Sequence, residues 1–113
     1  MELIRKDKLL KLKRKKQGNV KLSKAIDKLI QDIENSEWTS KSEVLKFRTD
    51  ADRVHNDNFY FFDINIHRTM ILITFNEQEA EIIWVGNHSE YDKTFKGNKQ
   101  TIETWLRNKG KIK

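Results

Sequence analysis

The chain of 113 residues contains no cysteine and no proline, and only four glycines. The absence of cysteine excludes disulfide bonds, thiolate metal sites, iron–sulfur clusters and a cysteine nucleophile. No run of apolar residues is longer than four, as at 70–73 and 82–85, whereas a bilayer-crossing helix needs about 20. The charged N-terminus does not lead into the apolar region of a signal peptide. We therefore expect a small soluble protein of the cytoplasm.

The chain also lacks a P-loop, a GxGxxG motif and a serine-centred elbow, which argues against nucleotide-binding enzymes and serine hydrolases of those types. Hydrophobic residues make up 36% and aromatic residues 10%, with three tryptophans, which is too rich in core-forming residues for a disordered chain. The length suits one domain.

Charge is strongly segregated along the chain. Residues 1–25 carry ten basic and two acidic side chains, residues 26–92 carry six and fourteen, and residues 93–113 carry seven and one. The basic ends would attract a polyanion, with a salt-dependent affinity, although lysine-rich ends are often only solvated surface. The acidic middle could face a basic protein partner.

Two helices are predicted near the N-terminus. Residues 5–16 form a lysine-rich segment with few apolar positions, and residues 20–34 form an amphipathic helix that Asn19 caps. The core-facing positions of the second helix are Leu22, Ala25, Ile26, Leu29, Ile30 and Ile33.

Two further helices follow from capping signals. Ser40 and Glu43 match a capping box that begins a short helix ending near Phe47. Asn98 is the expected cap of a C-terminal helix that stops at Gly110.

Strands are predicted where the hydrophobic period changes to two, at residues 59–65, 67–75 and 79–86, with a hairpin turn at 76–78 and a short first strand at 2–4. The middle strand divides into two faces, one with Thr69, Ile71, Ile73 and Phe75, the other with Arg68, Met70, Leu72 and Thr74. The element order predicts an α+β fold in which helices cover one face of an antiparallel meander.

Reactive side chains concentrate in three segments, at 50–53, 67–68 and 86–93. Arg68 stands on an otherwise apolar strand, where a cation is costly to bury unless it meets an anion. That anion is either a carboxylate such as Glu90 or Asp92 in a structural salt bridge, or a phosphate, whose geometry a guanidinium matches.

The segment from His88 to Lys93 holds an imidazole, two carboxylates, a phenol and an ammonium, a set suited to acid–base chemistry. The alternative is that His88 is an ordinary surface histidine, as we expect for His55. In an extended segment His88, Glu90 and Asp92 would share a face and could hold a divalent cation, but the neighbouring lysine disfavours one.

These residues together resemble a known family. The series Ala-Asp-Arg-Val at 51–54, Phe-Asp-Ile-Asn at 62–65, Arg68 with the apolar run after it, and Ile-Trp-Val-Gly-Asn-His-Ser-Glu-Tyr-Asp at 83–92 is similar to the HigB-type toxins of bacterial type II toxin–antitoxin modules. The resemblance covers roughly residues 1–93.

The resemblance implies a RelE/ParE-like fold and an mRNA endonuclease that needs no metal or other cofactor, acts on translating ribosomes and is silenced by a helix-turn-helix, HigA-like antitoxin. By position, Arg68 would stabilise developing charge and His88 would act as acid or base. Tyr91 would orient or stack a base, and Glu90 and Asp92 would be a base or orienting groups.

The basic residues would bind RNA through its phosphates. His67 falls where the family has a tyrosine. The predicted RNA-binding residues are His67, Lys93, Lys13, Arg14, Lys15, Lys16, Lys96 and Lys99. Residues 1–113 are expected to be one domain, whose basic extension at 94–113 either contacts the ribosome or packs over the cleft.

Two non-catalytic alternatives remain for the same fold. One is a binding module that inhibits a topoisomerase, as in the ParE branch. The other is a degenerate toxin that acts only by binding its antitoxin.

Overall fold

The computed structural model describes residues 1–55 and 58–113 of the chain. Its strands are β1 (Glu2–Ile4), β2 (Asp52–His55), β3 (Phe59–Ile64), β4 (His67–Thr74) and β5 (Glu79–Asn87). Its helices are α1 (Asp7–Lys15), α2 (Val20–Glu34), α3 (Lys41–Phe47), α4 (His88–Phe95) and α5 (Lys99–Asn108). Within the described residues no helix combines the length and apolar character needed to span a membrane. The expectation for the His55 side chain lies outside what is described.

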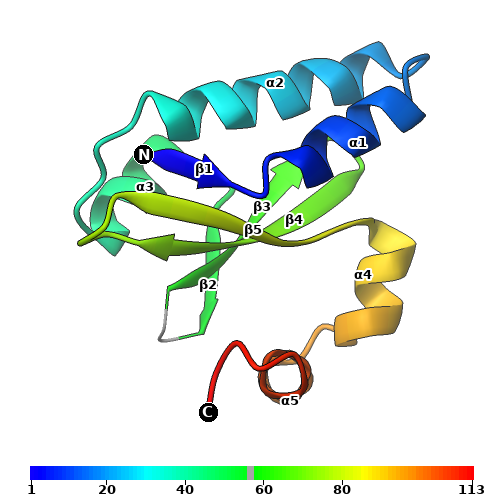
Figure 1. The fold of residues 1–113 in the computed structure, drawn as a ribbon. Helices are drawn as coiled ribbons and strands as arrows, with labels where there is room; N and C mark the ends of the chain where they lie inside the picture. The colour runs from blue at the N-terminus through cyan, green and yellow to red at the C-terminus, as the bar shows by residue number, and fades with distance from the viewer. Residues whose placement is uncertain (56–57) are drawn as a thin grey trace.

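The five strands form one sheet in the order β1-β5-β4-β3-β2. Strands β3 to β5 pair antiparallel as the predicted meander. The sequence did not predict β2, which adds an antiparallel edge strand beside β3, and β1 adds a parallel edge strand beside β5. Helices α1 and α2 carry the chain back across one face of the sheet, and α3 leads it to β2 at the opposite edge (Figure 1). The predicted α+β class is confirmed, and the sheet is mixed because of β1.

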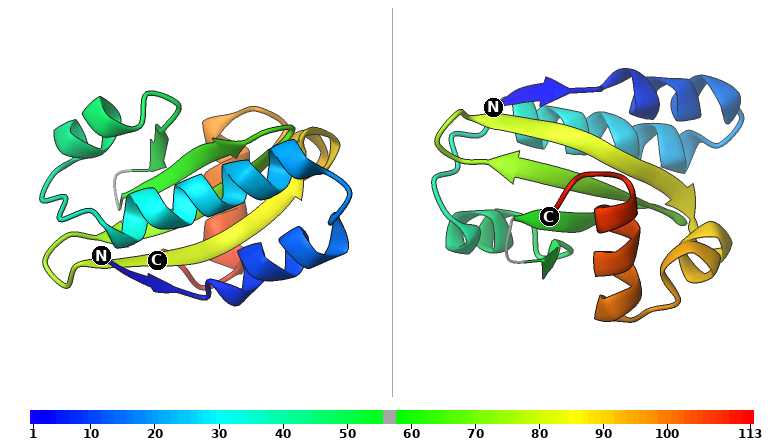
Figure 2. Two further views of the ribbon diagram at one scale, coloured as in Figure 1. Left: turned by 90° about the horizontal axis from the view of Figure 1, so that it is seen from above. Right: turned by 60° about the horizontal axis from the view of Figure 1, so that its bottom comes forward.

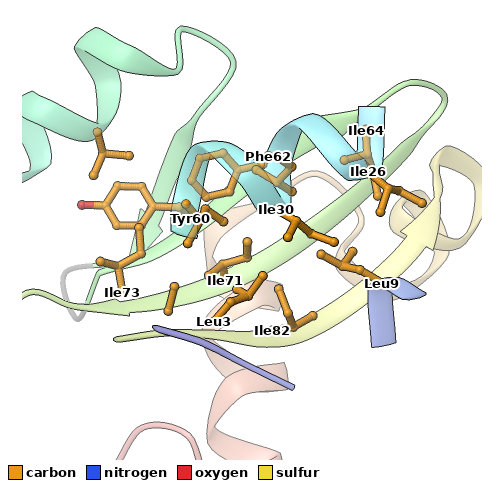
Figure 3. Packing of buried hydrophobic residues seen from close by; sticks show 14 of the residues in the cluster. Leu3, Leu9, Ile26, Ile30, Tyr60, Phe62, Ile64, Ile71, Ile73 and Ile82 are labelled. Carbon is orange, nitrogen blue, oxygen red and sulfur yellow. The ribbon is translucent and has the colours of Figure 1, made fainter. Parts of the chain in front are cut away.

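The larger core lies between this face of the sheet and α1 and α2. Helix α2 begins at Asn19, whose side chain accepts a hydrogen bond from the Leu22 N–H at 3.0 Å. Its apolar stripe then packs Ile26 and Ile30 against the strands (Figure 3). The sheet contributes Tyr60, Phe62, Ile64, Ile71, Ile73, Ala80 and Ile82.

Helices cover both faces of the sheet, which corrects the prediction that they cover one. Figure 2 shows α5 on the side of the sheet away from α2. A second core joins Phe95 of α4 and Ile102 and Leu106 of α5 to the sheet residues Val54, Phe59, Phe61, Met70 and Ile83. Apolar strand residues point to both faces of the sheet, so helices must cover the second face as well as the first.

The predicted division of β4 into two faces is confirmed. Ile71 and Ile73 belong to the larger core, whereas Met70 and Leu72 belong to the second. A β-bulge in β5 shifts the register between Met70 and Ile71, so that Ile83 and Trp84 both contribute to the second core. Bulges change which side chains reach a given face.

The helix ends agree with the capping predictions except at Ser40. The Ser40 hydroxyl accepts from the Glu43 N–H at 3.4 Å, but the Glu43 carboxylate binds the N–H and hydroxyl of Thr39 rather than completing a capping box. The Asn98 side chain caps α5 through the Thr101 N–H at 2.7 Å.

Candidate functional site

Arg68 lies at the beginning of β4 and points to the face that carries α4 and α5. Its Nε donates to Oδ1 of Asp63 at 2.8 Å, across the β3–β4 hairpin. The guanidinium carbon lies 4.9 Å from the centre of the Tyr91 ring and 5.3 Å from that of Phe61. The side chain is only 17% exposed. Two aromatic faces and one carboxylate therefore fix this cation.

The surroundings of Arg68 favour the positively charged form of its side chain. Burial by itself would lower its pKa, but the hydrogen bond and negative charge of Asp63, together with Tyr91 and Asp52, raise the pKa above its ordinary value. Among the described residues, the two terminal Nη groups of the guanidinium have no hydrogen-bond partner. A guanidinium carries five N–H donors, so most of them remain for a ligand.

Tyr91 reaches Arg68 because a helix begins directly after β5. The Asn87 side chain accepts from the Glu90 N–H at 2.8 Å, and the Glu90 carboxylate accepts from the Asn87 N–H at 2.9 Å. This capping box starts α4 at His88 and turns Tyr91 toward the sheet. The segment is helical rather than extended. This corrects the extended geometry in which His88, Glu90 and Asp92 would have shared one metal-binding face.

Helix α4 directs the remaining residues of the predicted site to different sides. His88 is exposed and lies one turn before Tyr91, and Asp92 is exposed one turn after His88, so these three share a side of α4. Glu90 points elsewhere and lines a hollow beside His67. Of the four predicted catalytic residues on α4, Tyr91 contacts Arg68.

A hollow of about 240 Å³ opens beside Tyr91, between β2 and the start of α5. Arg53 and Lys99 contribute cations to its lining, and Asp52 contributes a carboxylate. Lys99 was predicted to bind RNA from its position in the basic tail. The structure places it near Arg53 because α5 packs on β2.

The other predicted RNA-binding residues are spread over the surface. Lys15 and Lys16 line the hollow that contains His67, on the opposite side of the sheet from Arg68. Lys13 instead pairs with Asp27 of α2 at 2.7 Å, and Arg14 lies beside it at a separate depression. Lys93 and Lys96 are exposed.

Asp63 is the functional neighbour that sequence reasoning missed, because Glu90 and Asp92 were considered as the salt-bridge partners of Arg68. The signal was available in the two-residue turn at Asn65 and Ile66. A two-residue hairpin loop pairs the residues on either side symmetrically, which places Asp63 opposite Arg68. Within residues 1–55 and 58–113, no three potential metal ligands cluster.

A comparison with protein families supplies an independent assignment. A family model described as HigB toxin, the RelE-like toxic component of a toxin–antitoxin system, matches residues 22–94, which is more than half of the chain. The matched segment includes Arg68 and the whole of the segment from His88 to Asp92, and the α+β architecture is consistent with a RelE-like fold. No curated protein matches the chain. The resemblance seen in the sequence is therefore confirmed, and the chain belongs to the family of HigB toxins, the RelE-like toxic components of toxin–antitoxin systems.

Proposed function

We propose that this toxin is an endoribonuclease that cuts mRNA on translating ribosomes without a metal ion. The observation that carries the proposal is the arrangement of Arg68, held by Asp63 through Nε and by the rings of Tyr91 and Phe61, with its Nη groups unpaired in the described residues. The two outer N–H groups of a guanidinium match two oxygens of a phosphate. A preorganised cation of this kind is suited to stabilising a phosphorane-like transition state.

The proposed reaction uses the ribose of the substrate as its nucleophile. The 2′-hydroxyl loses its proton to a base while its oxygen bonds to the adjacent phosphorus. The bond from phosphorus to the 5′-oxygen breaks, and that oxygen gains a proton from an acid. The products are a 2′,3′-cyclic phosphate and a 5′-hydroxyl, so no metal-bound water is consumed.

We assign one of the two proton transfers to His88. Its exposed imidazole lies one helical turn from Tyr91, which contacts Arg68, and an imidazole can serve as an acid or a base. We assign to Asp92, one turn after His88, the role of orienting the imidazole. Tyr91 positions Arg68 and offers its ring edge to a base, while Glu90 positions α4 through the capping box.

Cations around this site support an RNA substrate. Arg53 and Lys99 line the hollow beside Tyr91, where they are placed to bind the phosphates that flank the cleavage point. The basic ends of the chain are suited to ribosomal RNA, whose phosphates provide affinity without sequence information. The mRNA and the ribosome are both found in the cytoplasm, where we expect the toxin to act.

A toxin of a toxin–antitoxin system has a cognate antitoxin as its partner. We propose that this antitoxin is a helix-turn-helix protein. We also propose that residues 94–113 belong to the same domain as the rest of the chain, because Phe95, Ile102 and Leu106 are buried in the second core.

The experiment that tests the proposal compares induced wild-type toxin with Arg68→Ala and His88→Ala. Growth arrest is measured, and new mRNA ends are mapped by primer extension on a translated message with and without ribosomes. Both variants should cut roughly 100-fold more slowly than the wild type, since loss of one transition-state donor costs about that much. Lys24→Ala, which removes an exposed cation on α2, serves as the control.

New 5′ ends that appear only with ribosomes would establish both the activity and its context. Folded Arg68→Ala protein that still produces the wild-type pattern of ends would contradict the proposal. Circular dichroism melts show whether each variant is folded.

One observation favours a non-catalytic alternative. Helix α5 packs on the same sheet face that carries Arg68, which narrows access to that face. A binding module for a topoisomerase or for the antitoxin alone would tolerate His88→Ala. Growth arrest that survives His88→Ala but not Arg68→Ala, with no new mRNA ends, would favour this second function.

A further inference from the structure

A second hollow lies on the other side of the sheet from Arg68, between α1 and the adjoining ends of β4 and β5. Its volume is about 350 Å³, within the lower part of the range of about 300–1,000 Å³ for small-molecule sites. Side chains of both signs line it, with cations in excess: Lys8, Lys11, Lys15, Lys16, His67 and Glu90.

The cations gather there because of the period of α1. Lys8, Lys11 and Lys15 are spaced by three and four residues, so they form one stripe, while Leu9 turns to the core. Burial and the nearby charges of Arg5 and Lys111 lower the pKa of Lys8, although Asp7 and Glu81 act in the opposite direction. An anion bound in the hollow would be attracted by the lysines that line it.

Glu90 is the carboxylate in the lining, and it is already engaged. Its side chain accepts the Asn87 N–H in the capping box that begins α4. The lining of the hollow therefore contains four lysines and one glutamate. Among the described lining residues, no further carboxylate balances the excess positive charge.

His67 provides an independent sign of a missing ligand. It is only 5% exposed, and its Nδ1 is buried without a hydrogen-bond partner in the described part of the chain. A buried polar atom without a hydrogen-bond partner destabilises the folded state. Burial lowers the pKa of His67, Lys16 and His88 lower it further, and Glu90 acts against them. These surroundings favour the neutral form of the imidazole.

We propose that this hollow binds a backbone phosphate of single-stranded RNA, and that it extends the site at Arg68. The inference rests on the proposed function for the identity of the ligand as RNA. His67 and Arg68 are consecutive residues of β4, so their side chains point to opposite faces at the same strand end. An RNA strand that leaves Arg68 and passes over the adjacent turn, where Ile66 is exposed, enters the hollow directly.

The hollow adjoins the strand end that carries Arg68, and this continuity favours RNA over an acidic protein segment as the ligand. A strand of regularly spaced phosphates can contact the Nη groups of Arg68 and the lysine stripe of α1 in succession. The bound phosphate places negative charge beside His67, which stabilises the protonated imidazole.

The test measures binding of a fluorescein-labelled 2′-O-methyl RNA, which cannot be cleaved because its 2′-oxygen is blocked. The variant Lys11→Gln/Lys15→Gln removes two cations of the hollow, and Lys21→Gln/Lys24→Gln removes two exposed cations of α2 as a matched control. Fluorescence anisotropy is recorded over a series of salt concentrations.

We expect the hollow variant to bind about tenfold more weakly. The slope of log K against log salt should fall by about 0.7 for each phosphate that the variant no longer neutralises. The control should stay within about twofold of the wild type, since its lysines lie away from the hollow. In NMR titrations, adding the RNA should raise the pKa of His67 in the wild type and not in the hollow variant.

An unchanged affinity and salt slope in the hollow variant would overturn the inference. Competition by poly-glutamate as effective as that by RNA of equal charge would also overturn it, and would assign the hollow to an acidic protein. The wild type is assayed for mRNA cleavage in parallel. If it cleaves while the hollow variant binds normally, only the hollow is disproved. If it binds RNA through the hollow without cleaving, only the nuclease is disproved.

Discussion

The guanidinium of Arg68 lies over the ring of Tyr91, with 4.9 Å between the guanidinium carbon and the ring centre. This contact joins the beginning of β4 to α4 through two residues that are 23 positions apart in the chain. Phe61 and Phe95 surround the same tyrosine ring, at 5.0 and 5.6 Å between ring centres. The orientation of the proposed phosphate-binding group therefore depends on an aromatic cluster as well as on Asp63.

Replacement of Tyr91 tests this dependence. Tyr91→Phe keeps the ring and should retain mRNA cleavage within about threefold, whereas Tyr91→Ala should lose roughly tenfold or more, because a partly desolvated cation–π contact is worth about 1–2 kcal/mol. Primer extension on a translated mRNA provides the rates. Equal loss in both variants would instead indicate that the phenolic hydroxyl takes part in the reaction.

Gly86 is required by the position of the Trp84 ring. A Cβ atom at Gly86 would lie 2.5 Å from Cζ2 of Trp84 and 3.2 Å from Cβ of Glu90. Gly86→Ala must displace the indole ring and should lower the free energy of unfolding by about 1–3 kcal/mol. Gly18→Ala is the matched control, because its Cβ would have nothing within 4 Å. Urea denaturation followed by tryptophan fluorescence measures both, and equal midpoints for the two variants would contradict the steric argument.

Arg48 holds α2, α3 and β3 together through two carboxylates. It donates to Oδ2 of Asp32 at 3.0 Å and to both carboxylate oxygens of Asp50, and its side chain is 13% exposed. Arg48→Met removes the cation that pairs with Asp50 and leaves the buried Asp32 with the exposed Lys28, and it should cost about 3–5 kcal/mol of stability. Lys28→Met removes an exposed cation from Asp32 and should cost less than about 1 kcal/mol. Chemical denaturation distinguishes these values, and a small loss for Arg48→Met would show that the network is weak.

The lowered pKa of His67 predicts a pH-dependent stability. Burial favours the neutral imidazole in the folded state, whereas the unfolded side chain takes up a proton near its ordinary pKa of 6.5. Between those two values the unfolded state binds more protons, so the free energy of unfolding falls as the pH drops below about 6.5. It levels off once the pH passes the folded-state pKa.

The comparison of wild type with His67→Gln isolates this contribution. Urea midpoints measured between about pH 7.5 and 5.5 should fall more steeply for the wild type than for the variant, because the variant has no imidazole at position 67 to protonate. Identical slopes would show that His67 has the same pKa in both states.

Much of the fold was predictable because it depends on local periodicity. Strands β3, β4 and β5 are short runs rich in aromatic and β-branched residues, and α2 shows a helical stripe. Local capping by Asn19 and Asn98 was predicted correctly, since a side chain that caps a helix needs only its nearest backbone N–H groups. At Ser40 the prediction failed in part, because the Thr39 hydroxyl competes for the Glu43 carboxylate at 2.6 Å.

The helix that begins at His88 was harder to predict. Its segment is short and polar, so its hydrophobic period is weak, and its start depends on the Asn87–Glu90 capping box. Its inner side is fixed by Tyr91 and Phe95, which pack against Phe61 from a distant part of the chain. Long-range aromatic packing therefore decides the local structure here.

The sequence by itself determined most of the secondary elements, the division of β4 into two faces and the membership of the family, because these depend on the type and spacing of residues along the chain; β2 and α4 are the exceptions. The tertiary structure alone decided that Tyr91 of α4 contacts Arg68, and that Glu90 and His67 share a separate basic hollow. The reason is that pairing across strands and packing of helices on a sheet bring together side chains whose separation in the chain carries no information about their distance in space.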